Sequence, residues 1–466
     1  MSKSELHIYN TWSRKKEIFQ PLEAGKINMY VCGLTTYDYC HIGHARMLVA
    51  FDIIVRHLRN SGYEVTYVRN ITDIDDKILA RAQENGEAFT SLTERFIKAT
   101  HEDEMALGIL PPDKEPRATA HIDQIIDMIS VLVAREAAYR ANNGDVYYSV
   151  RQFADYGKLS NKNPEELLAG ARIEVDEDKR DPRDFALWKA AADGEVGWDS
   201  PWGYGRPGWH IECSAMSTCC LGNSFDIHGG GSDLMFPHHE NEIAQSEAAT
   251  GVKFARYWLH NGSVRVDNEK MSKSLGNFFT VREVLEKYPA EVVRYLLLAS
   301  HYRSPINYSD QGLEQAAASL ERFYAGLRPF DTAAARDIVN SRFEKAFKAA
   351  MNDDFNTPVA LGVLFDLVRE INRCKDAEPE VAADLARLLV KLGSTLGILQ
   401  QSPEVFLQQT SREKPDAEII KALIAERQQA RADRDWALAD QIRARLAAMN
   451  VVVEDSAKGS VWRIER

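Results

Sequence analysis

The 466-residue sequence has no long apolar run and contains only six cysteines. A helix that crosses a bilayer needs about 20 predominantly apolar residues, so we expect no membrane-spanning segment. Residues 1–7 carry charged side chains and no apolar core, which argues against an export signal. Six cysteines do not suggest a disulfide scaffold and favour a reducing cytoplasm. Basic residues are also in deficit. Because the formal net charge is −12, a nucleic-acid partner would have to bind local basic surface.

Strand and helix patterns alternate in the first part of the chain. Ile27–Cys32 has the pattern of a short buried strand, a helical pattern runs from Gly43 to Asn60, and Val65–Val68 alternates as a second strand. This order and these lengths are typical of a doubly wound α/β fold. The alternation returns from Ser224 to His260, after a stretch that interrupts it. We therefore predict a doubly wound, Rossmann-type parallel sheet with an insertion.

Beyond about residue 281 the pattern becomes mostly helical. Apolar residues recur at helical spacing up to residue 399, which predicts a helical bundle. Two charged amphipathic helices, 417–432 and 436–449, are followed by two short strands, 451–454 and 461–464, with a turn at Lys458-Gly459. This order predicts a small mixed α+β module at the C-terminus.

The segment His41-Ile42-Gly43-His44 follows the first predicted strand and opens the helix after it. In an α/β nucleotide-binding fold, backbone N–H groups and the positive end of a helix dipole face phosphates at this position. His41 and His44 could hydrogen-bond a phosphate and stabilise charge at phosphorus, and Gly43 would let the backbone approach closely. On the residues alone, two histidines that begin a helix and bind nothing remain an alternative.

A second candidate segment is Lys270-Met271-Ser272-Lys273-Ser274, with Gly276 shortly after it. Two ammonium groups suit a departing pyrophosphate, because they complement its charge as it leaves. Serine and glycine neighbours would permit such a loop to close over a nucleotide and reopen. An exposed basic turn is the alternative for five residues in isolation.

Four scattered side chains could hold a metal ion. Cys32 ends the first predicted strand, Cys213 lies far along the chain, and His238 and Glu242 are four residues apart. Sulfur, nitrogen and one carboxylate suit zinc. Because the cysteines do not form a close pair, core cysteines without a metal remain an alternative.

Pro237 is well placed to begin the helix that carries the last two of these residues. On a helix His238 and Glu242 would share one face, as two ligands of one ion must. His239, three residues before Glu242, is a geometric competitor, and spacing alone does not choose between the two histidines.

The unaltered HIGH (41–44) and KMSKS (270–274) sequences together resemble the motif pair of class I aminoacyl-tRNA synthetases. Within that class, Cys32, Cys213, His238 and Glu242 match the zinc site of cysteinyl-tRNA synthetases residue by residue. Residues 32–38, 70–77, 228–234 and 354–358 are similar to the same family, and the similarity runs from about Leu6 to the C-terminus. Leu34 and Thr36 depart from the family's usual proline and valine without removing a ligand.

This resemblance implies ATP-dependent activation of L-cysteine to cysteinyl-adenylate, followed by transfer to the 3′ end of tRNA(Cys). It implies one Zn²⁺ per chain and Mg²⁺ bound to ATP. A metal deprotonates a thiol outright, whereas serine's hydroxyl is a harder and far less acidic ligand, so the zinc would select cysteine. The implied catalytic residues are His41, His44, Lys270 and Lys273. The implied ATP-binding residues are His41, Gly43, His44, Asp233 and Lys273, and Cys32, Thr72 and Trp209 are placed at the amino-acid pocket.

The resemblance also implies a domain order and a set of partners. The predicted parts are the first half of the Rossmann catalytic domain with HIGH (1–120), a connective insertion (121–205), the second catalytic half with the zinc site (206–265), the KMSKS loop and stem-contact region (266–312), a tRNA-binding helical bundle (313–400) and an anticodon-binding module (416–466). The expected partners are tRNA(Cys), L-cysteine and ATP, and the family expectation is a monomer in the cytoplasm.

The C-terminal module combines arginines with Trp436 and Trp462, which suits stacking on splayed anticodon bases. Its basic residues are Arg427, Arg431, Arg434, Arg443, Arg445, Lys458 and Arg463. The same segment is rich in acids, so a solvated pair of amphipathic helices is the alternative on residues alone.

Two other functions share some of these features. A related ligase that couples cysteine to an amino sugar would keep all three motif sets but lack the C-terminal module, so the stretch 417–466 argues against it. A catalytically inactive, RNA-binding or regulatory relative would be expected to show broken motifs, and here both motifs and all four ligands are intact.

Overall fold

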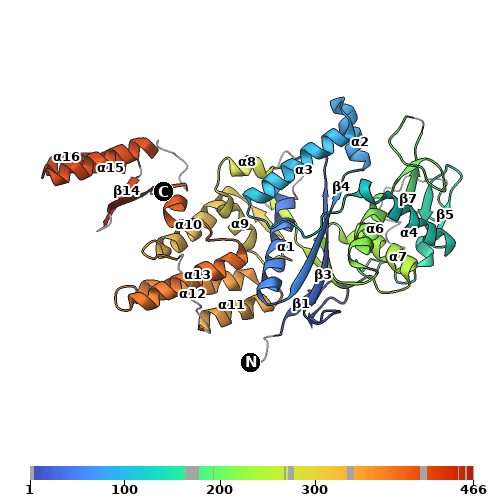
Figure 1. Ribbon diagram of the computed structural model, residues 1–466, viewed down its shortest axis with the longest axis horizontal. Coiled ribbons are helices and arrows are strands. Elements are labelled where there is room, and N and C mark those ends of the chain that lie inside the picture. Colours follow the sequence, from blue (N-terminus) through green and yellow to red (C-terminus); the bar gives the residue numbers. More distant parts are fainter. Residues whose placement is uncertain are drawn as a thin grey trace. The chain divides into compact units, whose positions relative to one another are not determined.

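The computed structural model describes residues 5–162, 178–192, 194–266, 269–270, 278–332, 341–409, 417–449, 451–456 and 459–464 (Figure 1). The chain forms two compact units. The first comprises residues 1–281, 300–307 and 349–356, and the second comprises 282–299, 308–348 and 357–466.

A four-stranded parallel sheet in the order β10-β9-β3-β4 forms the centre of the first unit. Its strands are β3 (Lys26–Thr35), β4 (Glu64–Thr72), β9 (Phe225–Gly231) and β10 (Ala255–Asn261). The chain runs outward from β3 to β4 and, later, outward from β9 to β10, so the strand order reverses between β3 and β9. In open α/β sheets, ligands bind beyond the carboxyl ends of the strands at such a reversal.

Helices cover both faces of this sheet. The helix α1 (Ile42–Asn60) connects β3 to β4, and α7 (Glu240–Thr250) connects β9 to β10, while α6 (Trp209–Leu221) precedes β9. Figure 1 shows α1 on one side of β3, with α6 and α7 on the other side. Burial on both faces explains why β4 is almost continuously buried rather than alternating. The predicted doubly wound α/β fold is confirmed.

A separate antiparallel sheet interrupts the sequence between the two halves of the parallel sheet. Its order is β5-β6-β7-β8, formed by Ala138–Arg140, Val146–Tyr148, Phe185–Ala190 and Gly205–Pro207. With α4 (Ile122–Ala134), it encloses a core that includes Ile129, Leu187 and Trp188. The other elements of this unit are β1 (His7–Asn10), β2 (Lys15–Ile18), α2 (Asp76–Asn85), α3 (Phe89–Ala106), the short helical turns Ala118–His121 and Val150–Gln152, β11 (Val264–Val266), β12 (Glu269–Lys270) and β13 (Ile306–Tyr308).

The second unit is mostly helical, as predicted. Its helices, some of which begin or end at the boundary between units, are α8 (Val281–Leu285), α9 (Ala290–Leu298), α10 (Asp310–Leu327), α11 (Arg342–Asn352), α12 (Thr357–Cys374), α13 (Pro379–Leu396), α14 (Pro403–Gln409), α15 (Ala417–Ala432) and α16 (Trp436–Ala448). The strands β14 (Val451–Ser456) and β15 (Gly459–Ile464) form an antiparallel hairpin. The predicted order of two helices and two strands is therefore confirmed, while Lys458 of the predicted turn lies outside the described residues.

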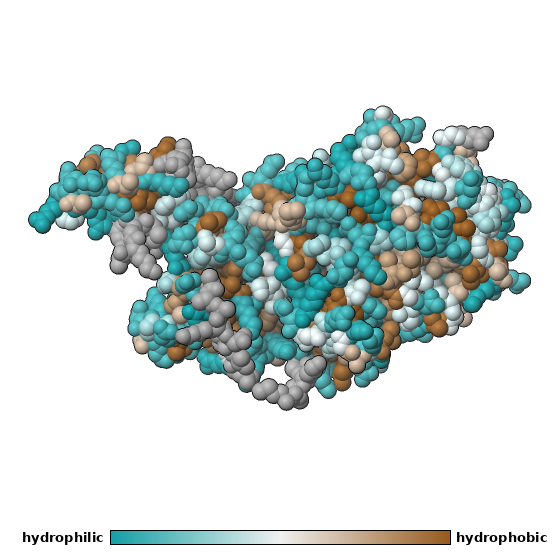
Figure 2. All heavy atoms as spheres, viewed as in Figure 1, coloured by the Kyte–Doolittle hydropathy of each residue, from teal (hydrophilic) through white to brown (hydrophobic). Residues whose placement is uncertain are grey.

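None of the described helices is both long and apolar enough to cross a membrane. On the face drawn in Figure 2, hydrophilic side chains predominate and apolar ones are scattered among them.

The structure corrects one local prediction. Pro237 does not begin a regular helix: the Phe236–Pro237 peptide bond is cis and Phe236 is extended, with φ −141° and ψ 131°. A π-helical turn over Met235–His239 leads into α7, which begins at Glu240. The physical reason is that a residue before proline is pushed out of the helical region.

Candidate active site

A cavity of about 440 Å³ opens at the carboxyl ends of β3, β9 and β10, where the strand order reverses. Its walls come from the ends of these strands, the start of α1 and the start of α2. The lining residues are Cys32, Gly33, Leu34, Thr35, Tyr37, Asp38, Tyr39, His41, Gly43, His44, Met47, Lys77, Trp209, Gly231, Asp233, Leu234, Asn261, Ser263, Val264 and Phe278. The predicted ATP residues His41, Gly43, His44 and Asp233 and the predicted amino-acid residues Cys32 and Trp209 thus share one cavity.

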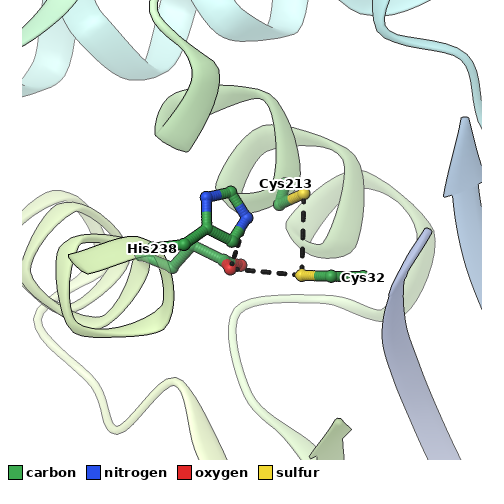
Figure 3. A group of neighbouring side chains, drawn as sticks. Cys32, Cys213 and His238 are labelled. Atoms are coloured by element: carbon green, nitrogen blue, oxygen red, sulfur yellow. Dashed lines mark hydrogen bonds and ion pairs between the residues drawn. The ribbon is translucent and has the colours of Figure 1, made fainter. Parts of the chain in front are cut away.

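Four buried side chains meet at Cys32, the one of them that lines the cavity, and we call this cluster the closed end. Cys32, Cys213, His238 and Glu242 offer ligand atoms that all lie within 4.8 Å of one another. Figure 3 shows the side chains of Cys32, Cys213 and His238 turned toward one point from different elements. The Cys32 and Cys213 sulfurs are 3.8 Å apart, and Cys32 Sγ lies 3.3 Å from Glu242 Oε1. Nε2 of His238 lies 3.1 Å from the same carboxylate oxygen.

These separations fit a tetrahedral metal ion. Two sulfurs that are each about 2.3 Å from a tetrahedral zinc ion lie about 3.8 Å apart, and a nitrogen and an oxygen at about 2.0–2.1 Å lie about 3.3 Å apart. Burial, and then the neighbouring Cys213 and Glu242, raise the pKa of the Cys32 thiol well above its ordinary value. Without a cation this site therefore disfavours the thiolate, and a divalent ion is the charge that would stabilise it.

Neighbouring residues hold the nitrogen and oxygen donors in place. His228 Nε2 lies 2.8 Å from Glu242 Oε2, the carboxylate oxygen turned away from the cysteines. Nδ1 of His210 lies 2.9 Å from Nδ1 of His238, and burial lowers the pKa of His238 to about 3. When His238 is neutral and carries its proton on Nδ1, facing His210, the lone pair is on Nε2. This is the arrangement that a metal-binding histidine needs.

His239 remains close to this cluster. Its Nε2 lies 3.9 Å from Glu242 Oε1, compared with 3.1 Å for Nε2 of His238. Cys32, His228 and His239 form a second grouping of three donors. The group that contains His238 supplies four donors, whereas the group that contains His239 supplies only three. Both groups include Cys32, so they compete for it, and a four-coordinate ion fits the group with His238 better.

Cys32 reaches this position because the chain after it bends tightly against β4. The register between β3 and β4 shifts between Val31 and Leu34, and the Gly33 amide donates to Asn70 Oδ1 at 2.8 Å. A Cβ on Gly33 would lie 1.7 Å from the Asn70 backbone oxygen, so only glycine permits this approach. Asn70 Oδ1 also accepts from the Cys213 thiol at 3.7 Å.

The two histidines of the HIGH sequence cap α1 at the other end of the cavity. The His44 amide donates to His41 Nδ1 at 3.2 Å, and the His41 amide donates to His44 Nδ1 at 3.4 Å. The two rings stack with centroids 3.5 Å apart. Because both Nδ1 atoms accept backbone N–H groups, any contact with a ligand has to use Nε2.

Lys270 contributes only its backbone to the described structure, in β12, and Lys273 and the rest of residues 271–277 lie outside the described residues. The described segment that follows pairs with the HIGH segment. The Ile42 amide donates to the Phe279 carbonyl at 3.1 Å, and the Val281 amide donates to the Cys40 carbonyl at 2.8 Å. The Phe278 ring lies 5.0 Å from the His41 ring. Residues 278–281, which follow the KMSKS segment in the chain, are therefore tied to the start of α1.

Thr72 and Trp209 differ in their relation to the cavity. Trp209 is 37% exposed, lines the cavity and stacks on His238 with ring centroids 4.3 Å apart. Thr72 is buried and does not line the cavity, and its hydroxyl accepts from Asn70 Nδ2 at 3.3 Å.

The sequence predicts no functional role for Lys77, His210 or His228. Lys77 is the sole lysine or arginine among the described lining residues, and its ammonium lies 5.8 Å from the centre of the Tyr37 ring. Its place at the start of α2, in a segment already similar to the family, was an available signal. His228 begins another such segment, 228–234, whereas His210 offered no signal, because its partner His238 comes from a different element.

In the C-terminal module the two tryptophans differ. Trp436 is 59% exposed, whereas Trp462 is 6% exposed and packs with Ile420 and Ile442 in the module's core. The prediction that Trp462 stacks on bases is therefore wrong. Arg427 is buried at 7% exposure, and the side chain of Arg463 lies outside those described.

Three family models match the chain. The tRNA synthetases class I (C) catalytic domain covers residues 18–318, the DALR domain covers 346–400, and the cysteinyl-tRNA ligase anticodon binding domain covers 417–463.

Curated relatives match almost the whole chain. The cysteine–tRNA ligase of Ectopseudomonas mendocina is 60% identical over 98% of this chain and 99% of the relative. That of Azotobacter vinelandii is 61% identical over the same shares.

Solved structures support the fold alone, because their sequence identities are low. A Mycobacterium tuberculosis methionyl-tRNA synthetase with methionyl-adenylate superposes with TM-score 0.56 at 16% identity, over 86% of this chain and 94% of that one. An Agrobacterium radiobacter LeuRS–tRNA complex gives TM-score 0.56 at 12% identity, over 94% and 95%. From the domain models and the full-length relatives, the chain belongs to the cysteinyl-tRNA synthetases of class I.

Proposed function

We propose that this chain activates L-cysteine with ATP and transfers it to the 3′ end of tRNA(Cys). One observation carries the proposal: Cys32, which belongs to a cluster of four metal-donor side chains, and the N-terminus of the HIGH helix line one cavity at the reversal of the parallel sheet. Donors for a thiol-binding ion and donors for phosphate are therefore close enough to act on one small substrate and ATP.

We assign the metal as one Zn²⁺ held by Cys32, Cys213, His238 and Glu242, with His238 rather than His239 as the nitrogen donor. Two sulfurs, one imidazole and one carboxylate suit zinc, and the separations above fit its bond lengths. When bound, the ion supplies positive charge that favours a substrate thiolate over serine's hydroxyl.

The residues at the start of α1, which we call the open end of the cavity, would act on ATP. The first amides of α1 and the Nε2 atoms of His41 and His44 are suited to charge that develops on the phosphates during attack by the cysteine carboxylate. Lys77, across the cavity, would face the same anionic groups. Lys270 and Lys273 are proposed to bind the departing pyrophosphate, and Mg²⁺ is expected on ATP.

Three further residues are proposed to contact substrate or to shape its pocket. Asp233 would bind the ATP ribose from the turn after β9, and Trp209 would cover the amino-acid side of the cavity while it holds His238 by stacking. Thr72 would act through Asn70, since Thr72 itself does not line the cavity.

We propose that the functional unit is a single chain in the cytoplasm. The cavity and the four donors come from one chain, and all six cysteines are free thiols, which suits a reducing compartment. The proposed division of the chain remains the six parts predicted from the sequence, with 313–400 and 416–466 for tRNA.

Charging of total bacterial tRNA with radiolabelled cysteine and ATP, with unlabelled serine in excess, tests this function. Label that becomes acid-precipitable only with tRNA, and that serine does not reduce, is the expected result. Cysteine-dependent ATP–pyrophosphate exchange without tRNA labelling would contradict the tRNA-charging step and favour the amino-sugar ligase instead. Absence of both activities would contradict the enzymatic function altogether.

A further inference from the structure

The hydroxyl of Tyr30 is a buried polar group that the activity described above does not use. Tyr30 is completely buried, and its Oη has no hydrogen-bond partner among the described residues. An unpaired hydroxyl in a protein interior has lost its hydrogen bonds to water without replacing them, which destabilises the folded state. Such a group therefore calls for an explanation.

Tyr30 lies beside the cysteines of the candidate metal site. It precedes Cys32 by two residues in β3, and residues two apart on a strand point to the same face of a sheet. Tyr30, Cys32 and Cys213 belong to one buried cluster, and the Tyr30 ring lies 5.3 Å from the ring of His228. The phenol is therefore packed among the metal donors and the residue that holds one of them.

The Cys213 sulfur, in the same buried cluster, is a potential acceptor for the hydroxyl. Burial, and then the charges of Cys213, Cys32 and Glu242, raise the pKa of the Tyr30 hydroxyl well above its ordinary value, so the hydroxyl keeps its proton and can donate. The geometry between hydroxyl and sulfur nevertheless falls short of a formed hydrogen bond. A neutral thiol accepts a hydrogen bond weakly, whereas a sulfur that carries negative charge accepts strongly.

We propose that Tyr30 is a positioning residue for the metal, and that its hydroxyl donates a hydrogen bond to Cys213 Sγ when that sulfur is a metal ligand. This inference rests on the proposed metal site and deepens it. The hydroxyl would orient the sulfur and stabilise its negative charge, so that the sulfur stays deprotonated as a ligand. The ion would then be held more tightly and would keep more positive charge for the thiol of the substrate.

The proposal predicts effects of opposite sign on the two forms of the full-length chain. Tyr30→Phe removes a hydroxyl that, under this proposal, has no hydrogen-bond partner in the metal-free chain and donates to Cys213 Sγ in the metal-bound chain. The metal-free variant should therefore be as stable as the parent or more stable, while its zinc affinity should fall about 10–100-fold. A tyrosine that served only to fill the core would not separate the two forms in this way.

Tyr148→Phe is the matched control. Tyr148 is also completely buried in the same unit, but its hydroxyl already donates to the Ala244 carbonyl at 2.9 Å, and it packs in a different core cluster. This variant should lose stability with and without metal and keep the zinc affinity of the parent.

The test is zinc affinity by competition with a chromophoric chelator, together with the sulfur-to-metal charge-transfer absorption of the Co²⁺-loaded chain. The expected results for Tyr30→Phe are the affinity loss above and a band at lower energy, because sulfur without the hydrogen bond is the better electron donor. A parent-like affinity, within about twofold, and an unchanged band in Tyr30→Phe would overturn the proposal. A parent chain that takes up no stoichiometric metal would instead overturn the proposed metal site, and this inference with it.

Discussion

The two ends of the active-site cavity are constructed in different ways. The closed end gathers Cys32, Cys213, His238 and Glu242 from β3, α6, the turn before α7 and α7 itself, and Cys32 and Glu242 are 210 residues apart in the chain. The open end is formed by the consecutive residues 41–44, whose histidines cap their own helix. One end is a product of the whole fold, whereas the other follows from local helix chemistry.

This difference has energetic consequences. At the closed end, buried donors disfavour charge on Cys32 and depend on a cation to balance it. At the open end, the amide–imidazole contacts of His41 and His44 join groups of one helix and require no cation. Changes at the closed end should therefore alter metal content and activity together, and changes at the open end should alter activity without altering metal content.

Replacement of Cys213 by serine should have the largest effect. Residues that merely orient a metal ligand are worth about 10–100-fold in affinity or activity, so loss of a ligand should exceed about 100-fold in cysteine-dependent ATP–pyrophosphate exchange, with loss of bound zinc. Metal analysis and the exchange assay measure the two effects. Cys374→Ser is the control, because Cys374 is buried in the second unit, where its thiol donates to the Glu370 carbonyl at 3.1 Å. Cys213→Ser with full zinc and full exchange would remove the basis for the closed end.

His41→Asn should separate catalysis from helix capping at the open end. Asparagine is a good N-cap residue, so its stability should stay within about 0.5 kcal/mol of the parent, whereas His41→Ala should lose about 1 kcal/mol. Both variants should lose about 100-fold in the exchange rate, because each removes an imidazole at the phosphates. Zinc content should stay unchanged in both. A fall in zinc content would show that the two ends are not independent.

Gly33→Ala should damage the closed end through the backbone. Its Cβ would fall 1.7 Å from the Asn70 carbonyl oxygen, so β3 has to move and Cys32 with it. We expect the free energy of unfolding to drop by about 2 kcal/mol, measured by urea denaturation, and the zinc affinity to drop too. Gly362→Ala is the control: a Cβ there meets no atom within 4 Å, and alanine favours the α12 helix by about 1 kcal/mol. Parent-like stability of Gly33→Ala would contradict the described approach of β3 to β4.

The smallest effect is expected in α3, outside the lining of the cavity. His101 Nε2 lies 2.9 Å from Glu115 Oε2, and this hydrogen bond raises the pKa of His101 above its ordinary value. A raised pKa in the folded state adds stability that is complete below about pH 6.5 and is lost as the pH rises through the folded pKa. His101→Gln should therefore lose less than about 1 kcal/mol at pH 5.5, because the histidine is half exposed, and nothing measurable at pH 8.5. Urea unfolding at the two pH values decides this, and an equal loss at both would contradict the assignment.

The same contrast explains what the sequence could predict. The order of strands and helices, the start of α1 at the HIGH residues and the helical second unit follow from local periodicity and capping, and they are confirmed. The joining of Cys32 to Glu242 follows from no local rule: the residue types allowed a metal site, and resemblance to a family selected it over core cysteines. The partners His210 and His228 were not predicted, because burial and ring contacts between distant segments decide their roles.

Two local details also escaped prediction for physical reasons. The cis peptide before Pro237 replaces a regular first turn, since both isomers are compatible with the same sequence pattern. Trp462 was expected at an RNA-binding surface but lies in the core, because a tryptophan on a two-stranded hairpin has two faces available and sequence alone does not say which is covered.

The central claim is that the closed end of the cavity holds a metal that binds the thiol of the substrate. Its most direct test is the absorption spectrum of the Co²⁺-loaded chain, titrated first with serine and then with cysteine. We predict that cysteine, but not serine, strengthens the sulfur-to-cobalt charge-transfer band, because a third sulfur joins those of Cys32 and Cys213. A chain that binds Co²⁺ at the four residues and shows the same spectrum with both amino acids would contradict the account.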